Sequence, residues 1–433
     1  MLLLDLPPEI FQRVVHELVL DVGINEAWKL RGVSRTFASE IHHDIFAYQP
    51  KETLIAHLSR NRYAKILENN FPLYIRNRMN TGVDSDGVLV FKVKALLDYL
   101  MKELHIQDFE RRQHYAAQLS EGILRFGGDP WNRVQWTEAF VWGQGTYQNF
   151  TQAVANKMKL SPATAAEKLC AAVAVNAYDL VPSLFEQSED PSNTHFVPPL
   201  VIAVKKGDVE MSRTLLECYK KSYPQRNARR DKFTAILVAI EANSVEALKL
   251  LLHSCKSWDR GQETEKSMRQ QWMNKAAATG SVALLEAIIE MKGGRKRMLT
   301  QEVVKSICGY GTVPLINHYI GTGLLDVNKT WSHTSPLVAA TEEPGFSGNE
   351  RIPALVLAGA DINKATGDGS TALFAALKHS AIGTVNYLLN HGADTNTESW
   401  PRYFYENTLK RRLQRILAGR AKAQLSATQT RNA

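Results

Sequence analysis

Apolar positions near the C-terminus of the chain recur at helical spacing. Leu373 and Ala376 lie three residues apart, and Val385 is followed at the same spacing by the pair Leu388-Leu389. Residues separated by three or four positions share one face of an α-helix. The pattern therefore predicts two short amphipathic helices, with a small alanine on the first helix where a neighbouring helix can approach closely.

Turn and capping residues border these two predicted helices. Asp368-Gly369 is typical of a tight turn, because glycine accepts a positive φ angle without steric cost. Thr371 is a predicted N-cap, since its hydroxyl can accept a hydrogen bond from a backbone N–H in the first helical turn. Gly392 suits the left-handed residue that ends a helix. The predicted unit is turn, helix, turn, helix.

The same unit can be traced backward through six more segments. Most have a small residue three positions after an apolar anchor, then Gly or Asn four positions later, and an apolar pair on the second helix. The seven anchors are Leu169, Leu200, Ile236, Met273, Val304, Leu337 and Leu373. They lie 31 to 37 residues apart, which favours one repeated unit over a bundle of unrelated helices. The sixth unit carries an insertion within residues 342–349, predicted to form an exposed loop between its helices.

The order Thr-x-Leu, Ala, Val-x-x-Leu-Leu-x-x-Gly-Ala-Asp-x-Asn in residues 371–396 resembles the ankyrin repeat. Its ending Gly392-Ala393-Asp394-Thr395-Asn396 also occurs 33 residues earlier, as Gly359-Ala360-Asp361-Ile362-Asn363. Ala372 and Phe374 stand where the family usually has Pro and His, which weakens the capping network of the first helix. The resemblance implies an all-α solenoid of about seven repeats over residues 161–397.

Partner contacts in ankyrin-like stacks generally come from turn tips and from the exposed faces of the first helices. This resemblance gives candidate protein-binding positions on the concave face, although it does not identify the partner. The candidate residues are Lys205, Lys206, Asp368, Ser370 and His379.

Residues 1–48 have a different pattern. Leu6-Pro7-Pro8-Glu9-Ile10 places proline in the first turn of a helix, and apolar residues at helical spacing continue to Val19. A second short helix is predicted over residues 26–32, and a third begins after Ser34, a good N-cap. These residues therefore predict a small module of three helices.

The opening Leu-Pro-x-Glu-Ile and the later stretch Leu30-Arg31-Gly32-Val33-Ser34-Arg35-Thr36-Phe37 resemble the F-box. The resemblance implies docking to the linker subunit of a cullin-type ubiquitin ligase. Val22-Gly23-Ile24-Asn25 departs from the family, in which a negative residue and Leu commonly precede the second helix. The alternative is that the three helices only precede or cap the solenoid. The candidate docking face comprises Leu6, Pro7, Ile10, Val14 and Leu30.

The segment between the module and the repeats, residues 49–160, is predicted to be a mainly helical intervening region. Residues 51–68 and 91–104 have helical spacing. Its aromatic residues Trp131, Trp136, Trp142 and Tyr147 are expected to form core.

Residues 398–433 are predicted to form a basic capping helix and tail. Leu409, Leu413, Ile416 and Leu417 give this helix an apolar face. Its cations are either the solvated face of a terminal cap or a nuclear-localisation signal. The candidate signal comprises Lys410, Arg411, Arg412, Arg420 and Lys422.

Composition narrows the class of protein. Hydrophobic residues make up 44% of the chain and charged residues 22%, as expected for a folded chain with ample core material. No run of about 18 apolar residues occurs, and no secretory signal is apparent, so we expect no membrane association. The four cysteines are widely spaced and are expected to be reduced core thiols. The net charge of +8 favours an acidic partner or a nuclear address.

Motifs that carry chemistry do not occur in the sequence. There is no phosphate-binding P-loop, nucleophile elbow or metalloprotease helix, so we expect neither catalysis nor a cofactor. His42 and His43 are adjacent on a predicted helix, where their side chains diverge by about 100° and cannot chelate one metal ion. We expect both histidines at the surface and no metal site.

Two functional hypotheses remain. In the first, the chain is a monomeric adaptor whose repeats bind a target protein while the F-box-like module recruits a ubiquitin ligase. In the second, it is a nuclear co-regulator that binds transcription factors without ubiquitin chemistry. No helix-turn-helix, basic-zipper or zinc-finger pattern is present, so direct binding to nucleic acid is not expected. The expected location is the nucleus, the cytoplasm or both, with the nucleus favoured.

Overall fold

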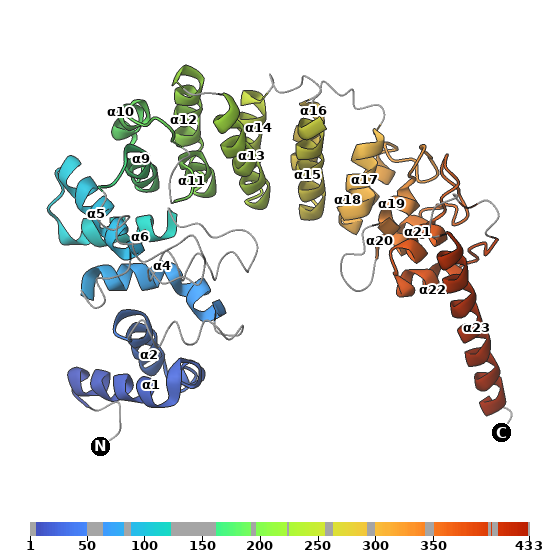
Figure 1. The fold of residues 1–433 in the computed structure, drawn as a ribbon, viewed down its shortest axis with the longest axis horizontal. Helices are drawn as coiled ribbons and strands as arrows, with labels where there is room; N and C mark the ends of the chain where they lie inside the picture. The colour runs from blue at the N-terminus through green and yellow to red at the C-terminus, as the bar shows by residue number, and fades with distance from the viewer. Residues whose placement is uncertain are drawn as a thin grey trace. The chain divides into compact units, whose positions relative to one another are not determined.

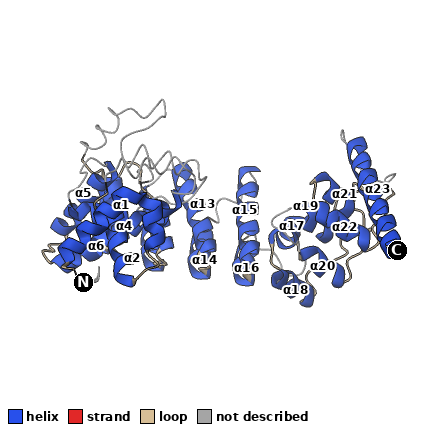
Figure 2. Cartoon of the chain, turned by 90° about the horizontal axis from the view of Figure 1, so that it is seen from below, coloured by secondary structure: helices blue, strands red, loops and turns tan. Residues whose placement is uncertain are grey.

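A computed structural model gives the fold of this chain. It describes residues 6–49, 64–81, 88–122, 162–191, 196–222, 225–255, 263–291, 299–342, 350–396, 400 and 406–431. Every regular element within these ranges is a helix (Figure 2), which confirms the all-α fold class. The chain divides into two compact units, Met1–Asp231 and Lys232–Ala433, and each is described by itself. No helix among the described residues is long and apolar enough to span a bilayer.

The first unit begins with helices α1 (Pro8–Leu30) and α2 (Arg35–Ala47). Gly23, with φ 80° and ψ 159°, interrupts α1 and divides it into two helical segments, so this region has three helical segments as predicted. Ser34 is the N-cap of α2, and its hydroxyl accepts a hydrogen bond from the Phe37 N–H at 3.1 Å. Buried side chains of α1, among them Phe11, pack against α2.

Three further helices connect the module to the repeats: α4 (Ala64–Thr81), α5 (Val88–Glu103) and α6 (Phe109–Gly122). Helix α4 packs on α2, α5 and α6, and both α5 and α6 pack on the first repeat helix, α9 (Ala165–Ala174). The intervening region is therefore attached to the solenoid wherever it is described. The predicted aromatic core around Trp131 lies outside the described residues.

Seven helix pairs follow among the described residues, each consisting of a first and a second helix, and Figure 1 shows their order along the chain. In the first unit, α9 is paired with α10 (Val181–Glu186), which the 3-10 helix η3 (Tyr178–Leu180) precedes, and α11 (Pro199–Lys205) is paired with α12 (Val209–Ser222). The next pair, α13 (Gln225–Glu241) and α14 (Val245–Ser254), begins where the two units meet. The remaining pairs are α15 (Glu263–Thr279) with α16 (Val282–Glu290), α17 (Gln301–Tyr310) with α18 (Val313–Gly321), α19 (Pro336–Glu342) with α20 (Arg351–Leu357), and α21 (Ala372–Lys378) with α22 (Ile382–Asn390).

The apolar anchors of the repeat lie in the core of the stack. All seven are on first helices, and none is more than 3% exposed. First helices pack on first helices, as in α9 on α11 and α17 on α19, and second helices pack on second helices, as in α14 on α16. The periodic apolar residues of the sequence therefore form one core within each unit.

In five repeats, the turn between the two helices has a left-handed residue. Asn176, Gly207, Asn243 and Gly280 occupy this position with φ between 52° and 76°, and Ser380 takes it in the last repeat with φ 59°. Glycine accepts this conformation without strain, and asparagine tolerates it better than most residues. Gly311 differs, because its backbone is extended. Glycine is needed at this position for another reason: a Cβ atom here would lie 2.3 Å from the Ile307 carbonyl oxygen.

The recurring Gly-Ala-Asp-x-Asn ending ties neighbouring repeats together. The Asn328 amide donates to the Gly359 carbonyl at 2.9 Å and accepts from the Asp361 N–H at 2.8 Å. Asn363 makes the same two bonds one repeat later, with the Gly392 carbonyl at 3.1 Å and the Asp394 N–H at 2.7 Å. The Gly, Asp and Asn of this ending therefore recur because they form hydrogen bonds between neighbouring repeats. The loop predicted within 342–349 falls almost entirely on residues outside the described ranges.

Helix α23 (Glu406–Arg431) covers the end of the last repeat (Figure 1). Leu409 and Leu413 are buried, and α23 packs on α21. The Arg412 guanidinium donates to the Leu377 carbonyl at 2.9 Å, at the C-terminal end of α21. A cation suits this position, because carbonyls at a helix C-terminus carry partial negative charge.

The four cysteines are free thiols. Cys170, Cys255 and Cys308 are buried and Cys218 is half-buried, so three of the four lie in the core as expected. Burial raises the pKa of Cys255 to about 11 and that of Cys308 to about 12, so both are protonated at neutral pH.

Candidate functional site

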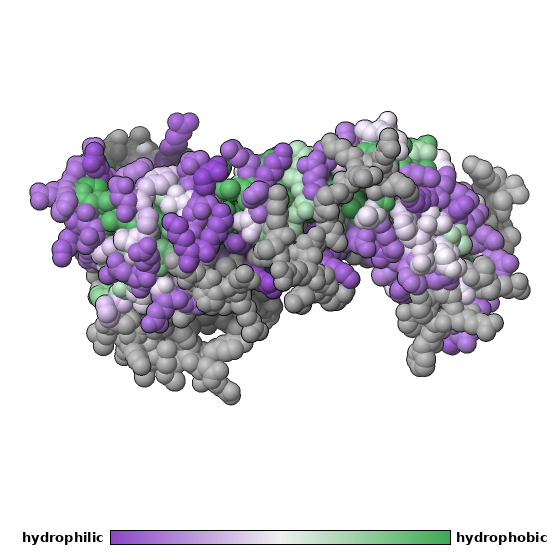
Figure 3. All heavy atoms as spheres, turned by 90° about the horizontal axis from the view of Figure 1, so that it is seen from above, coloured by the Kyte–Doolittle hydropathy of each residue, from purple (hydrophilic) through white to green (hydrophobic). Residues whose placement is uncertain are grey.

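Exposed apolar side chains are concentrated in the N-terminal helices. Across the described residues, twelve large apolar side chains are exposed, and seven of these lie within residues 6–49. The other five are on α5, α6, η3, α20 and α22, and the described part of the face in Figure 3 is mainly hydrophilic with separate apolar patches. This concentration makes the N-terminal helices a candidate protein-binding surface. The seven residues are Ile10, Val14, Leu20, Val22, Leu30, Val33 and Tyr48.

Four apolar residues form a stripe along α1, which we call the α1 stripe: Ile10, Val14, Leu18 and Val22. Their four-residue spacing places them on one slowly turning face that is about 18 Å long at 1.5 Å per residue. Leu18 is half-buried, whereas Ile10 is 50% exposed. The exposed acidic residue Glu17 lies beside them. The α1 stripe is therefore accessible to a partner.

The five predicted docking residues all reach the surface to some extent. Ile10 is 50% exposed, Val14 39% and Leu30 36%, Pro7 is exposed, and Leu6 is half-buried. These positions were predicted from the likeness of the opening residues to the F-box, and their role in docking stays a prediction. Leu20, Val22 and Val33 are also exposed, Val33 the most at 71%, but they were not part of the predicted face.

The aromatic side of the module is packed rather than accessible. The Trp28 and His42 rings are stacked with centroids 5.4 Å apart, and the Arg31 guanidinium lies 3.3 Å from the Trp28 ring centroid. His42 also forms a 3.1 Å hydrogen bond with Asn70 of α4, and burial lowers its pKa. His42 and His43 are both half-buried, so their predicted surface position is only partly confirmed, because the sequence did not reveal that α4 packs against this helix.

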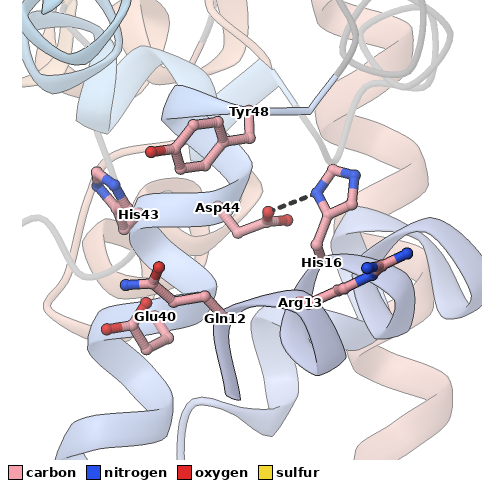
Figure 4. A pocket seen from close by; sticks show the side chains of 7 residues that line it. All are labelled: Gln12, Arg13, His16, Glu40, His43, Asp44 and Tyr48. Atoms are coloured by element: carbon pink, nitrogen blue, oxygen red, sulfur yellow. Dashed lines mark hydrogen bonds and ion pairs between the residues drawn. The ribbon is translucent and has the colours of Figure 1, made fainter. Parts of the chain in front are cut away.

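A pocket of about 300 Å³, lined by polar residues, lies between α1 and α2 (Figure 4). Asp44 is 5% exposed, and its two carboxylate oxygens are hydrogen-bonded to His16 Nδ1 at 2.7 Å and to Gln49 Nε2 at 2.5 Å. A buried carboxylate needs such partners, because burial of an unpaired charge is costly. The bonds therefore hold α1 and α2 together. The lining residues are Gln12, Arg13, His16, Glu40, His43, Asp44 and Tyr48.

The chemistry available in this pocket is limited. No serine, threonine or cysteine lines it, so it offers no common hydroxyl or thiol nucleophile. Among the described residues, no group of three or more His, Cys, Asp or Glu side chains could hold a metal ion. The arrangement is suited to joining helices and to contact with a polar ligand or protein.

The predicted repeat-face lysines contact the stack itself. Lys206 Nζ donates to the Ala174 carbonyl at 2.5 Å and to the Asn176 side chain, and burial lowers the pKa of this lysine. Lys205 Nζ donates to the Glu121 carbonyl at 3.3 Å. Both cations lie at the C-terminal ends of preceding helices, where they stabilise partial negative charge. Their role in partner binding stays a prediction.

The turn tips of the sixth and seventh repeats pair with each other. The Gly367 and Asp368 N–H groups donate to the carbonyls of Trp331 and Ser332 at 2.9 and 2.8 Å. Burial alone would raise the pKa of Asp368, but hydrogen bonds from Thr366, from His333 and from the Ser370 N–H outweigh this and bring the pKa down to about 2.

The predicted tip residues differ in accessibility. Ser370 is only 7% exposed, and His379, at the C-terminal end of α21, is half-buried. Asp368 is hydrogen-bonded within the tips, whereas the His333 side chain beside it is 70% exposed. His333 is therefore a more accessible tip residue than the predicted ones. Sequence reasoning missed it, because the unit in residues 331–357 follows the repeat pattern only loosely.

The five basic residues predicted as a nuclear-localisation signal have different environments. Arg412 and Arg420 bind the last repeat, through the Leu377 carbonyl at 2.9 Å and the Asn386 side chain at 3.2 Å. Lys410 is half-buried, and Arg411 and Lys422 are exposed. Two members of the set therefore have a structural role in the cap.

Comparison with known proteins shows ankyrin repeats in two stretches of the chain. The family described as ankyrin repeats (3 copies) matches residues 169–261, and the single ankyrin repeat matches residues 368–399. No curated protein matches the chain. Among solved structures, the ankyrin repeat domain of Bcl-3, a member of the IkappaB protein family, is similar with 21% identity and a TM-score of 0.30, over 46% of this chain and 87% of that chain. Neither family match includes the N-terminal helices, so their likeness to the F-box stays a prediction.

Ankyrin repeats are generally protein-interaction modules rather than enzymes. The chain contains such repeats in residues 169–261 and 368–399, and this indicates a role in protein–protein interaction.

Proposed function

We propose that this protein is an adaptor with two docking surfaces. Its repeats bind a target protein, and its N-terminal helices bind the linker subunit of a cullin-type ubiquitin ligase. The observation that carries the proposal is that seven of the twelve exposed large apolar side chains in the described part of the chain lie within residues 6–49.

The α1 stripe supplies enough apolar surface to matter for binding. Complete burial of an exposed isoleucine side chain stabilises by about 1.5–3 kcal/mol, so covering the half-exposed Ile10 contributes about 1 kcal/mol. Val14 and Val22 add smaller amounts, because they are 39% and 37% exposed. A partner that covers the α1 stripe would also remove water from a charged side chain introduced there. A charged substitution therefore weakens binding by more than the loss of the apolar contact alone.

Co-purification tests this proposal. A tagged full-length chain is expected to recover a cullin complex, and Ile10→Asp is expected to reduce the recovery at least about tenfold, which corresponds to 1.4 kcal/mol. Ile382→Asp is the matched control, because Ile382 is 58% exposed and also lies in the first turn of a helix, α22. If the wild-type chain recovers no cullin complex, or both variants behave alike, the ligase role is wrong.

A second candidate function is a nuclear co-regulator, favoured by the exposure of Arg411 and Lys422 on α23. Imaging of a tagged chain with both residues replaced by Ala tests it. Arg412→Ala serves as a control for damage to the cap, because Arg412 binds the last repeat. An unchanged distribution of the double variant would remove the support for this function.

A further inference from the structure

Nearly all of the excess positive charge of this protein lies in its last 33 residues. Residues 401–433 contain eight Lys and Arg and one Glu, a net charge of +7, whereas the whole chain has +8. The preceding 400 residues are therefore close to neutral. The basic character of the protein belongs to the region of α23.

The described cations of α23 are divided between two faces. Arg412 and Arg420 point to the last repeat, where they are hydrogen-bonded to α21 and α22. Arg411, Arg415 and Lys422 are exposed. Their spacing of four and seven residues places these three within about 40° of one another around the helix, in a row about 17 Å long. We call this row the basic row.

Among the described residues, no carboxylate pairs with the basic row. In the part of the chain that the structure describes, no ion pair involves Arg415 or Lys422, and the one hydrogen bond of Arg411 is to the Asn407 carbonyl within the same helix. The positive charges of the row are therefore directed to solvent or to a ligand.

The chemistry of the neighbouring side chains indicates the kind of ligand. Thr408, Gln414 and Ala418 are exposed near the basic row, and no large exposed apolar side chain occurs on the described part of α23. Protein–protein interfaces have an apolar core, and proteins that bind single-stranded nucleic acid use aromatic side chains for base stacking. Neither kind of residue is exposed here. Arginine, lysine, glutamine and threonine are instead residues that contact phosphate oxygens of duplexes.

We infer that the basic row of α23 binds the phosphate backbone of double-stranded nucleic acid without reading its base sequence. A straight helical row fits a duplex, which is stiff and carries about one negative charge per 1.7 Å of its axis. The contacts of Arg412 and Arg420 with the last repeat hold the helix in place before binding, so little ordering is required. Sequence-specific motifs are not needed for such binding, since phosphate contacts carry no base information. This inference concerns a surface separate from the α1 stripe and does not depend on the adaptor role.

Fluorescence anisotropy with a labelled duplex of arbitrary sequence tests the inference. The full-length chain is expected to bind duplex DNA at 50 mM salt, and binding is expected to weaken as salt increases. The slope of log affinity against log salt changes by about 0.9 for each phosphate neutralised, so three contacts account for about 2.7 of the slope. The factor that these three contacts contribute to the association constant falls about 40-fold between 50 and 200 mM salt.

The triple variant Arg411→Gln, Arg415→Gln, Lys422→Gln is expected to lose this part of the salt dependence, because glutamine preserves helix propensity but removes the charges. A control with the same loss of charge replaces Lys102, Arg111 and Lys249, which are exposed on other helices, by Gln. The control should retain the wild-type slope. Duplex RNA serves as a second probe, and its affinity relative to duplex DNA shows which duplex the row prefers.

Three results would overturn the inference. The first is that the wild-type chain binds neither duplex at 50 mM salt. The second is that the triple variant and the charge-matched control weaken binding equally, which would indicate an effect of net charge alone. The third is that a polyglutamate peptide binds through the row while the duplexes do not, which would identify an acidic protein as the partner.

Discussion

Replacement of Lys92 by Met would test how the intervening helices are attached to the repeats. Lys92 on α5 and Glu167 on α9 are 75 residues apart in sequence, yet Lys92 Nζ lies 3.0 Å from each Glu167 carboxylate oxygen. The two side chains are only 4% and 1% exposed. Lys92→Met keeps the length of the side chain but leaves the Glu167 carboxylate buried without its counter-ion.

The magnitude follows from the remaining partners of Glu167. Removing one member of a buried ion pair costs about 3–5 kcal/mol, because an uncompensated charge remains. Glu167 still accepts a hydrogen bond from the Thr164 N–H at 3.0 Å, in a capping box at the start of α9. We therefore expect the lower end of that range, about 3 kcal/mol.

Hydrogen exchange detected by mass spectrometry is the suitable assay, since it reports on α9 separately from the other unit. A loss of about 3 kcal/mol corresponds to exchange of the α9 amides about 100-fold faster. Lys94→Met is the matched control, because Lys94 is exposed on the same helix, and it should change exchange little. The double variant Lys92→Met, Glu167→Gln should recover much of the loss, because glutamine is neutral and still completes the capping box.

The reasoning would be refuted if Lys92→Met left the exchange of α9 unchanged. It would also be refuted if Lys94→Met had an equal effect, or if the double variant were less protected than Lys92→Met alone. Any of these results would mean that α5 does not pack on the first repeat as described.

Three further predictions concern the repeats. Asn363→Ala removes two hydrogen bonds between repeats and should destabilise the last repeat by about 1–2 kcal/mol in hydrogen exchange, whereas Ala at the exposed Asn317 should have little effect. Asp368 has a folded pKa of about 2, below its usual 3.8, so its stabilising contribution is present above pH 4 and is lost as pH falls towards 2. The difference in melting temperature between the wild-type protein and Asp368→Asn should therefore shrink over that range, and a constant difference would contradict this. Gly280→Ala should lower the melting temperature, since φ is 76° and the new Cβ would lie 2.8 Å from the Thr312 hydroxyl, while Gly383→Ala in open space should not.

Much of the repeat fold could be predicted because it depends on local pattern. The anchor Leu169 is buried as its spacing predicts, and Thr371 caps α21, with its hydroxyl accepting from the Phe374 N–H at 3.3 Å. The lengths of the first helices could not be predicted. Helices α13 and α15 each have 17 residues, whereas α11 and α21 have seven, and an apolar anchor marks only where the helix touches its neighbours.

The candidate site was predictable only in part. The apolar pairs Ile10-Phe11 and Val14-Val15 show that α1 is rich in apolar residues, but only its packing on α2 decides that Phe11 and Val15 are buried while Ile10 and Val14 are exposed. The contacts of Lys206 and Arg412 with carbonyls of preceding repeats could not be foreseen, because a basic residue on a helix has the same sequence pattern whether it faces solvent or a neighbouring helix end. The bonds of Asp44 with His16 and Gln49 likewise depend on how α1 and α2 are packed.

The most direct test of the adaptor function is a calorimetric titration of the purified full-length chain with the purified linker subunit of a cullin-type ubiquitin ligase. Saturable one-to-one binding is predicted for the wild-type protein and for Ile382→Asp. Ile10→Asp is predicted to weaken it at least about tenfold. The absence of binding by the wild-type chain, or equal affinity for all three proteins, would contradict the claim that the α1 stripe recruits the ligase.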